Sequence, residues 1–159
     1  MINYKLTKTK PSKSEDFVIF SLGNEEYAID VLKVLEICRY ENIATIANMP
    51  SHIKGIKKLA DKMALILDLR LLFNIQPINY DDHTIIIVIK LAERLLGLIV
   101  SEVKEVLAIP ATDFRFENDF QALVHNYFIQ KVARVNERLF FIIDIEKLYN
   151  HEILHLVEQ

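Results

Sequence analysis

The chain of 159 residues is long enough for one ordinary domain, or for two very small ones packed together. Hydrophobic residues make up 52% and charged residues 26%, which predicts a substantial core beneath an ordinary polar surface. The net charge of −3 gives no reason to expect nucleic-acid binding or insertion into a membrane, and the single cysteine, Cys38, excludes an intramolecular disulfide. No secretory signal is recognisable, so we expect a cytoplasmic protein.

The first part of the chain is expected to form strands joined by tight turns, after a polar tail over residues 1–15. Residues 17–22 and 26–30 have the pattern of a hairpin around Gly23, because glycine adopts the positive φ that such turns need. The pattern of residues 31–39 predicts a helical turn followed by a strand.

A proline and a glycine mark the next segment, and a short helix is predicted over residues 49–55, stopped by its glycine. Strands are expected over residues 56–59 and 63–67. Asp68 is then expected to cap a helical turn over residues 69–73, because a carboxylate accepts hydrogen bonds from the free amides of a helix start.

The second part of the chain follows a bridge over residues 76–83 that is rich in turn-forming residues. Its expected elements are strands over residues 84–90, 95–100, 103–109, 127–135 and 138–143, with a loop over residues 111–124. Asp144 is expected to cap a final helix that runs to about residue 156.

The two parts of the sequence repeat each other. Residues 17–20 align without a gap on residues 86–89 at an offset of 69, and residues 63–68 align on residues 139–144 at an offset of 76. Short strands without βαβ alternation favour antiparallel barrels, and the tandem repeat favours two barrels on a shared core. The expected units are a first barrel over about residues 17–80, a second over about 81–145, interleaved with it, and a C-terminal helix over about 144–157.

Three groups of side chains have the residue types of a reactive site, and each has a simpler structural explanation. His151 and His155 stand four apart on the final helix, a spacing that can hold a metal, but no third ligand accompanies them. Asp68 and Asp144 both stand where a strand gives way to a helix, so capping explains them without catalysis. Cys38 follows aliphatic residues and fits a small buried side chain. The sequence therefore predicts no enzyme, no metal and no cofactor.

Several stretches of the sequence resemble the CheW family of chemotaxis coupling proteins. They are residues 20–37, 50–55, 67–70, 97–100 and 144–148, and the resemblance is collinear over residues 17–149. It implies a mainly β fold of two SH3-like five-stranded antiparallel β-barrels packed on a shared core, with short helices and a C-terminal helix. It also implies a non-enzymatic adaptor, monomeric on its own, that couples the cytoplasmic tips of methyl-accepting chemoreceptors to the regulatory domain of the histidine kinase CheA at membrane receptor arrays.

The resemblance further implies two partner-binding surfaces. The kinase side combines a Val-x-Glu-Ile segment with a turn between two strands, and its residues are Val34, Glu36, Ile37, Lys58, Leu59 and Ala60. The receptor groove is apolar, and its residues are Ile85, Gly97, Val103 and Val106. Aliphatic side chains would fill a partner's grooves, and a few charges would set register and specificity.

The kinase side departs from the family pattern at one turn. The family usually carries Asn-Leu-Arg-Gly where this chain has Lys-Leu-Ala-Asp over residues 58–61, so the habitual arginine is absent. A lysine is a poor substitute for an arginine that forms a bidentate ion pair. We hypothesise that Glu36 pairs instead with Arg39, Lys58 or Lys62.

Other functions are also compatible with the sequence. One is an adaptor of a sensory array outside chemotaxis, or a receptor-only binder whose kinase contact has been lost. Another is a double barrel that senses a small molecule. Such a sensor needs a cavity lined by convergent polar groups, and the apolar strands offer few of them.

Overall fold

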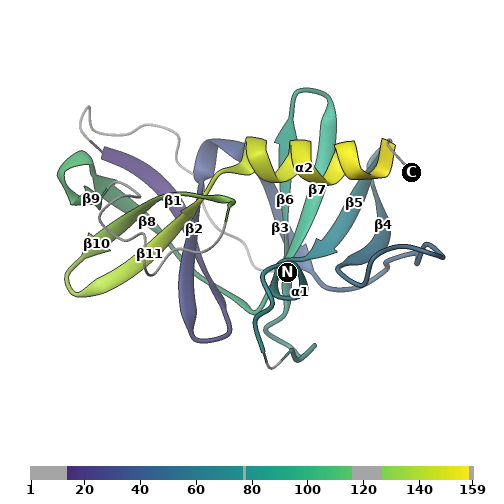
Figure 1. Cartoon of the computed structure of the whole chain (residues 1–159), viewed down its shortest axis with the longest axis horizontal. Helices are drawn as coiled ribbons and strands as arrows, with labels where there is room; N and C mark the ends of the chain where they lie inside the picture. The colour runs from purple at the N-terminus through teal and green to yellow at the C-terminus, as the bar shows by residue number, and fades with distance from the viewer. Residues whose placement is uncertain (1–13, 77, 116–126, 158–159) are drawn as a thin grey trace.

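The computed structural model describes residues 14–76, 78–115 and 127–157 of the chain, with side chains as far as Ile153 (Figure 1). The strands are β1 (Ser14–Leu22), β2 (Glu25–Asp30), β3 (Val34–Arg39), β4 (Ile53–Leu59), β5 (Lys62–Asp68), β6 (Ile85–Leu91), β7 (Arg94–Val100), β8 (Glu102–Pro110), β9 (Phe114–Arg115), β10 (Ile129–Val135) and β11 (Arg138–Ile143). The helices are α1 (Leu69–Leu72) and α2 (Ile145–Val157), with 3-10 turns at Val31–Lys33 and Ala111–Asp113.

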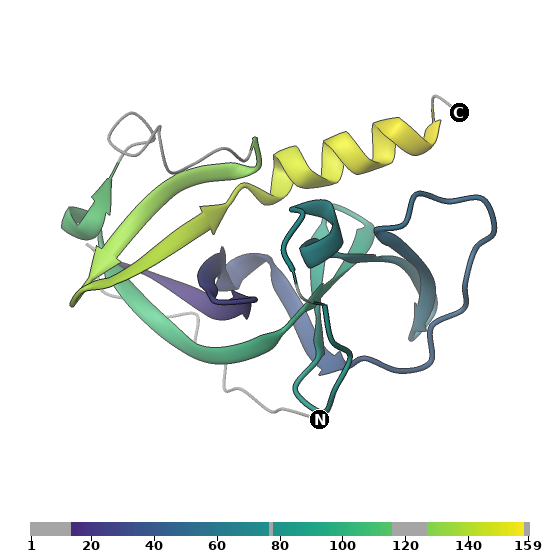
Figure 2. The ribbon, with the colours of Figure 1, turned by 60° about the horizontal axis from the view of Figure 1, so that its bottom comes forward.

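The strands form two curved sheets that lie side by side (Figure 2). The six-stranded sheet has the order β8-β1-β2-β11-β10-β9, and the five-stranded sheet has the order β3-β6-β7-β5-β4. Helix α2 leaves the end of β11 and runs across the five-stranded sheet, so it links a strand of one sheet to the surface of the other (Figures 1 and 2).

Each sheet combines strands from both halves of the chain. The six-stranded sheet takes β1 and β2 from the first half, whereas the five-stranded sheet takes β6 and β7 from the second. With the offsets of 69 and 76, the order β8-β1-β2-β11-β10 matches the order β3-β6-β7-β5-β4 strand for strand. The mainly β fold of two sheets with few helices is therefore confirmed, but a boundary near residue 80 does not separate the sheets.

Two features of the sheets differ from the expected five-stranded antiparallel barrels. The short strand β9 pairs with β10 and gives one sheet a sixth strand. In each sheet one neighbouring pair is parallel, β2 with β11 and β5 with β7. A hairpin forces antiparallel pairing, but these pairs join strands from different halves of the chain, and a long connection permits either direction.

Strand alternation distributes the apolar residues over three cores. On β1, Val18 and Phe20 face a shared core between the sheets, whereas Phe17 and Ile19 face the interior of the six-stranded sheet. The pattern repeats in the five-stranded sheet, where Ile86 faces that sheet's own interior and its neighbours face the shared core. Strands buried on both faces need nearly continuous apolar sequence, which explains the runs without polar alternation.

The predicted helix over residues 49–55 is wrong, because β4 begins at Ile53 after a turn in which the Ile53 amide donates to the Pro50 carbonyl at 3.0 Å. Gly55 has φ +146°, and a Cβ there would collide with the backbone carbonyl of Ala44. The neighbouring bridge joins Ala44 and Ile56 by two hydrogen bonds of 2.9 Å. This glycine therefore permits a close approach of two chain segments and does not stop a helix.

The ends of the predicted elements need smaller corrections. Strand β1 begins at Ser14, which pairs with Pro110, so the tail expected to reach residue 15 is shorter; its residues 1–13 lie outside the described part. The loop expected over residues 111–124 begins with a 3-10 turn and β9, and its remainder also lies outside the described residues. The helical turn and strand expected over residues 31–39 are confirmed.

Candidate partner-binding surfaces

The Val-x-Glu-Ile segment lies on β3, an edge strand of the five-stranded sheet. Val34 and Ile37 are 4% and 6% exposed and belong to the shared core, because a register shift after Val34 turns both inward. Glu36 is half-buried, and Leu35 is 48% exposed. The part of this segment that a partner can reach is therefore Leu35 and Glu36.

Leu35 was missing from the predicted site, although the repeat gives a signal for it. Its counterpart at the offset of 69 is Lys104, an ordinary exposed strand residue on β8. A leucine where the equivalent strand carries a lysine is an apolar residue that the fold does not require. Leu32, in the preceding 3-10 turn, is 47% exposed and adds to the same apolar edge.

The second predicted kinase-side element is the turn between β4 and β5. Lys58 and Ala60 are exposed, and Leu59 is half-buried. The residue with left-handed backbone geometry in this turn is Ala60, with φ 55°, one position before the place of the glycine in the Asn-Leu-Arg-Gly pattern. Leu59 packs on the interior core of the five-stranded sheet.

Cys38 of β3 packs on that same interior core. Because β3 and β4 are the two edge strands of this sheet, β3 and the turn after β4 lie at opposite edges of it. The segment between β3 and β4 closes part of the gap through the bridge of Ala44 and Ile56. Burial raises the pKa of the Cys38 thiol, which suits a packing side chain and not a nucleophile.

The hypothesis that Glu36 pairs with a nearby base finds no support in the described residues. No ion pair among them includes Glu36. Lys62 pairs instead with Glu93, with 3.0 Å between Nζ and Oε2. Glu36 is therefore a half-buried carboxylate available to a partner's cation.

The four residues predicted for the receptor groove do not form an open surface together. Ile85 and Val103 are 2% and 5% exposed and belong to the shared core. Gly97 faces the interior of the five-stranded sheet, where an added Cβ would meet the side chains of Ile66 and Ile86. Val106 is half-buried against the shared core and is the most accessible of the four.

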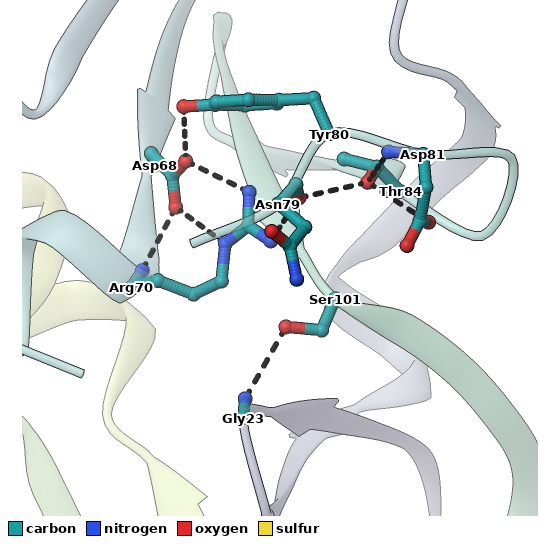
Figure 3. A network of polar contacts seen from close by, with 8 residues as sticks. All are labelled: Gly23, Asp68, Arg70, Asn79, Tyr80, Asp81, Thr84 and Ser101. Carbon is teal, nitrogen blue, oxygen red and sulfur yellow. Dashed lines mark hydrogen bonds and ion pairs between the residues drawn. The ribbon is translucent and has the colours of Figure 1, made fainter. Parts of the chain in front are cut away.

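A buried polar network on α1 was not predicted (Figure 3). The Arg70 guanidinium donates to both oxygens of Asp68, with Nε to Oδ1 at 3.1 Å and Nη2 to Oδ2 at 3.0 Å, and Nη1 donates to the Asn79 carbonyl at 2.7 Å. The Tyr80 hydroxyl donates to Asp68 Oδ2 at 2.6 Å. Burial, followed by this hydrogen bond, raises the pKa of Tyr80.

This network fixes the bridge between the two sequence repeats against the five-stranded sheet. Arg70 is 2% exposed and Asp68 is fully buried, so each needs the other's charge. The Tyr80 ring stacks on Tyr40, with 4.7 Å between ring centroids. The sequence signal for this polar network is an arginine two residues after a capping aspartate.

A second polar contact joins the repeats at the hairpin between β1 and β2 (Figure 3). The Gly23 amide donates to the Ser101 hydroxyl at 3.2 Å, and the Ser101 amide donates to the Ser21 carbonyl at 3.0 Å. The Ser101 hydroxyl therefore stabilises the turn between β1 and β2.

The residues considered for catalysis or metal binding have structural roles where the structure describes them. Asp68 accepts from the Arg70 amide at 2.9 Å and Asp144 from the Lys147 amide at 3.0 Å, which confirms both caps. No cluster of three histidine, cysteine or acidic side chains within the described ranges could hold a metal ion. His151 contacts Glu152, and the side chain of His155 lies outside those ranges. No described helix is long and apolar enough to cross a membrane.

Two curved sheets that exchange strands between the sequence repeats, with β3 as a partly exposed edge strand, define the class of fold. A family model described as the CheW-like domain matches residues 16–152. The chain is 38% identical to the chemotaxis protein CheW of Klebsiella aerogenes over 91% of this chain and 87% of that protein. It is 24% identical to CheW of Bacillus subtilis over 87% of this chain and 88% of the relative.

A solved structure supports the same assignment. The scaffolding protein TtCheW from Thermoanaerobacter tengcongensis superposes with a TM-score of 0.76 at 26% identity, covering 82% of this chain and 88% of that one. The chain belongs to the CheW-like family. It is a chemotaxis adaptor and scaffold, and not an enzyme.

Proposed function

We propose that this adaptor joins the regulatory domain of a CheA-type histidine kinase to the cytoplasmic tips of chemoreceptors, in the cytoplasm at receptor arrays, and without a cofactor. The observation that carries the proposal is the exposed edge at β3, where Leu35 and Glu36 follow the Val-x-Glu-Ile pattern. An edge strand offers unpaired backbone groups, and a leucine beside a carboxylate adds apolar area and charge.

The turn between β4 and β5 completes the proposed kinase side. Lys58 supplies an exposed cation, Leu59 a partly accessible apolar surface, and Ala60 only a methyl group where the family pattern has arginine. Binding would then depend more on Leu35 and Glu36 than on this turn. Buried Val34 and Ile37 would then support this surface from beneath.

The receptor side of the proposal rests on Val106, because it is the accessible member of the predicted groove. Ile85 and Val103 lie in the shared core against which Val106 packs, whereas Gly97 faces the interior of the five-stranded sheet. We expect Val106→Asp to weaken binding of a receptor tip peptide while the fold is retained.

The deciding experiment is titration calorimetry with the purified kinase regulatory domain. Wild type is expected to bind with micromolar or tighter affinity, and Leu35→Glu to bind at least about tenfold more weakly, a loss of about 1.4 kcal/mol. Lys104→Glu is the matched control, because Lys104 stands at the equivalent repeat position on the other sheet. It should bind as wild type does.

Ala60→Arg tests the departure at the turn. Equal binding by wild type and Ala60→Arg would mean that Leu35 and Glu36 compensate for the missing arginine. No binding by either protein would contradict the kinase part of the proposal and favour a receptor-only adaptor.

A further inference from the structure

A trough runs along one side of α2, between this helix and the tips of two hairpins of the five-stranded sheet. Its two parts have volumes of about 460 and about 530 Å³ and share Glu93, Arg94 and Tyr149, so they are neighbouring halves of one depression. Its apolar lining consists of Ile56, Met63, Leu65, Leu91, Ala92, Leu95, Tyr149 and Ile153. None of these residues belongs to the proposed kinase or receptor surface.

The charges around the trough are balanced except at one position. Lys33 Nζ lies 2.6 Å from Glu146 Oε1, and Lys62 Nζ lies 3.0 Å from Glu93 Oε2. Arg94 is exposed, and no ion pair among the described residues involves it. The trough therefore combines an apolar lining with one free positive charge.

The sequence repeat provides an internal comparison for this surface. At the offsets of 69 and 76, Leu95 and Lys62 correspond to Glu26 and Arg138 of the six-stranded sheet. There, Arg138 Nη2 lies 2.7 Å from Glu26 Oε1 and 3.0 Å from Glu105 Oε2, so ion pairs occupy the equivalent place. The same fold thus carries an ion pair at this position in the six-stranded sheet and an apolar trough in the five-stranded sheet.

We propose that the trough binds an amphipathic helix of a partner protein, with its apolar side against α2 and a carboxylate paired with Arg94. Tyr149 and Ile153 stand four apart and form the kind of ridge against which a second helix packs. The wall from Glu146 to Ile153 spans roughly 10 Å, about two helical turns. Met63 is 51% exposed at the rim, where a flexible thioether adapts to a partner's side chains.

The probe is a display library of helical peptides of about 16 residues, long enough to hold a helix in water. The full chain serves as bait, and the double variant Met63→Glu/Arg94→Glu serves for counter-selection. The expected winners have apolar residues at i, i+3, i+4 and i+7 and an acidic residue beside that stripe. Purified winners are then titrated by fluorescence anisotropy.

We expect each single substitution, Met63→Glu or Arg94→Glu, to weaken binding of the selected peptides at least about tenfold. Leu32→Glu is the matched control, because Leu32 is 47% exposed but lies outside the trough. Equal binding to wild type and to the double variant would overturn the proposal, as would a library that yields no helical binder. A concentration-dependent dimer that Met63→Glu abolishes would also overturn it, because it would assign the trough to a second copy of the chain.

The result is independent of the proposed function. Arg94→Glu is expected to bind the kinase regulatory domain as wild type does, because Arg94 lines the trough on β7 and belongs neither to the edge at β3 nor to the turn between β4 and β5. Failure of the helix proposal therefore leaves the kinase proposal standing, and the reverse also holds.

Discussion

The two sheets are equivalent in strand order, yet their equivalent turn positions reach a positive φ with different residues. The hairpin turns of the six-stranded sheet carry Gly23 and Asn136 at positive φ, and the equivalent positions of the five-stranded sheet carry Ala92 and Ala60. The four φ values lie between 48° and 61°. The backbone conformation at these turn positions is therefore the same in both sheets, whereas the residue type differs between them.

Polar anchoring differs between the sheets in the same way. After β5, Asp68 is fully buried and binds Arg70 and Tyr80, whereas after β11 the equivalent Asp144 is half-buried and caps a helix start through the Lys147 amide. One aspartate holds a network together, and the other accepts one local hydrogen bond. The predictions that follow test how far this asymmetry extends.

The largest effect is expected from Arg70→Met. This substitution leaves the Asp68 carboxylate buried without its cation and removes the shorter of two hydrogen bonds to the Asn79 carbonyl, so it should lower the free energy of unfolding by about 3–5 kcal/mol. Asp144→Ala removes only a cap and should cost about 1 kcal/mol. Urea unfolding followed by circular dichroism measures both, and equal losses would contradict the asymmetry.

The second effect concerns the interiors of the two sheets. Gly97 corresponds to Ala28, which is fully buried in the six-stranded sheet. In the five-stranded sheet a Cβ at residue 97 would meet Ile66 and lie 3.0 Å from Ile86 Cγ2. Gly97→Ala should therefore cost about 1–3 kcal/mol by overpacking.

Thermal unfolding checks this expectation, with Ala28→Gly as the reciprocal variant. Ala28→Gly should cost about 1 kcal/mol, because it removes a packed methyl group and loosens a strand. An unchanged melting temperature for Gly97→Ala would mean that the Ile66 side chain moves aside without cost.

The sequence predicted most of the strands, both caps and the final helix, because alternation, turn residues and capping carboxylates act over a few neighbouring residues. Interleaving of the two repeats was expected, but the particular strands that change sheets were not predicted, since the apolar pattern of β1 or β6 is the same whichever sheet the strand joins. In a strand that is apolar throughout, the sequence does not show which residues face the core and which face a partner. Ile85 and Val103 were expected at a partner-binding surface but lie in the shared core. The Arg70 network depends on the path of the bridge to Asn79, which no local pattern describes.

The third prediction uses α2, which covers the five-stranded sheet and has no equivalent of its length after β5. Glu152 is 2% exposed, and its Oε1 lies 2.6 Å from His52 Nε2 and its Oε2 3.0 Å from His151 Nδ1. Burial acts to raise the pKa of Glu152, but the hydrogen bonds with His52 and His151 outweigh it and lower the pKa.

A lowered pKa in the folded state gives stability above the unfolded pKa of about 4.3 and loses it as pH falls through the folded value. Glu152→Gln should therefore reduce stability by about 1–2 kcal/mol at neutral pH and by less at pH 3. Urea unfolding at the two pH values measures the difference. A loss that is the same at both would show that packing, and not charge, holds α2.

The smallest effect is expected at the left-handed turns, and it should stabilise the protein. Ala60→Gly and Ala92→Gly relieve the cost of a Cβ at positive φ, and this gain outweighs the greater freedom of glycine in the unfolded chain by about 0.5–1 kcal/mol each. In the other sheet, Gly23→Ala should destabilise by at least as much, because its Cβ would also lie 2.9 Å from Ile75 Cγ2. If the two glycine variants are not more stable than wild type, the turns of the five-stranded sheet do not hold alanine in a strained conformation. In that case the contrast between the sheets would lie in their polar networks and interiors alone.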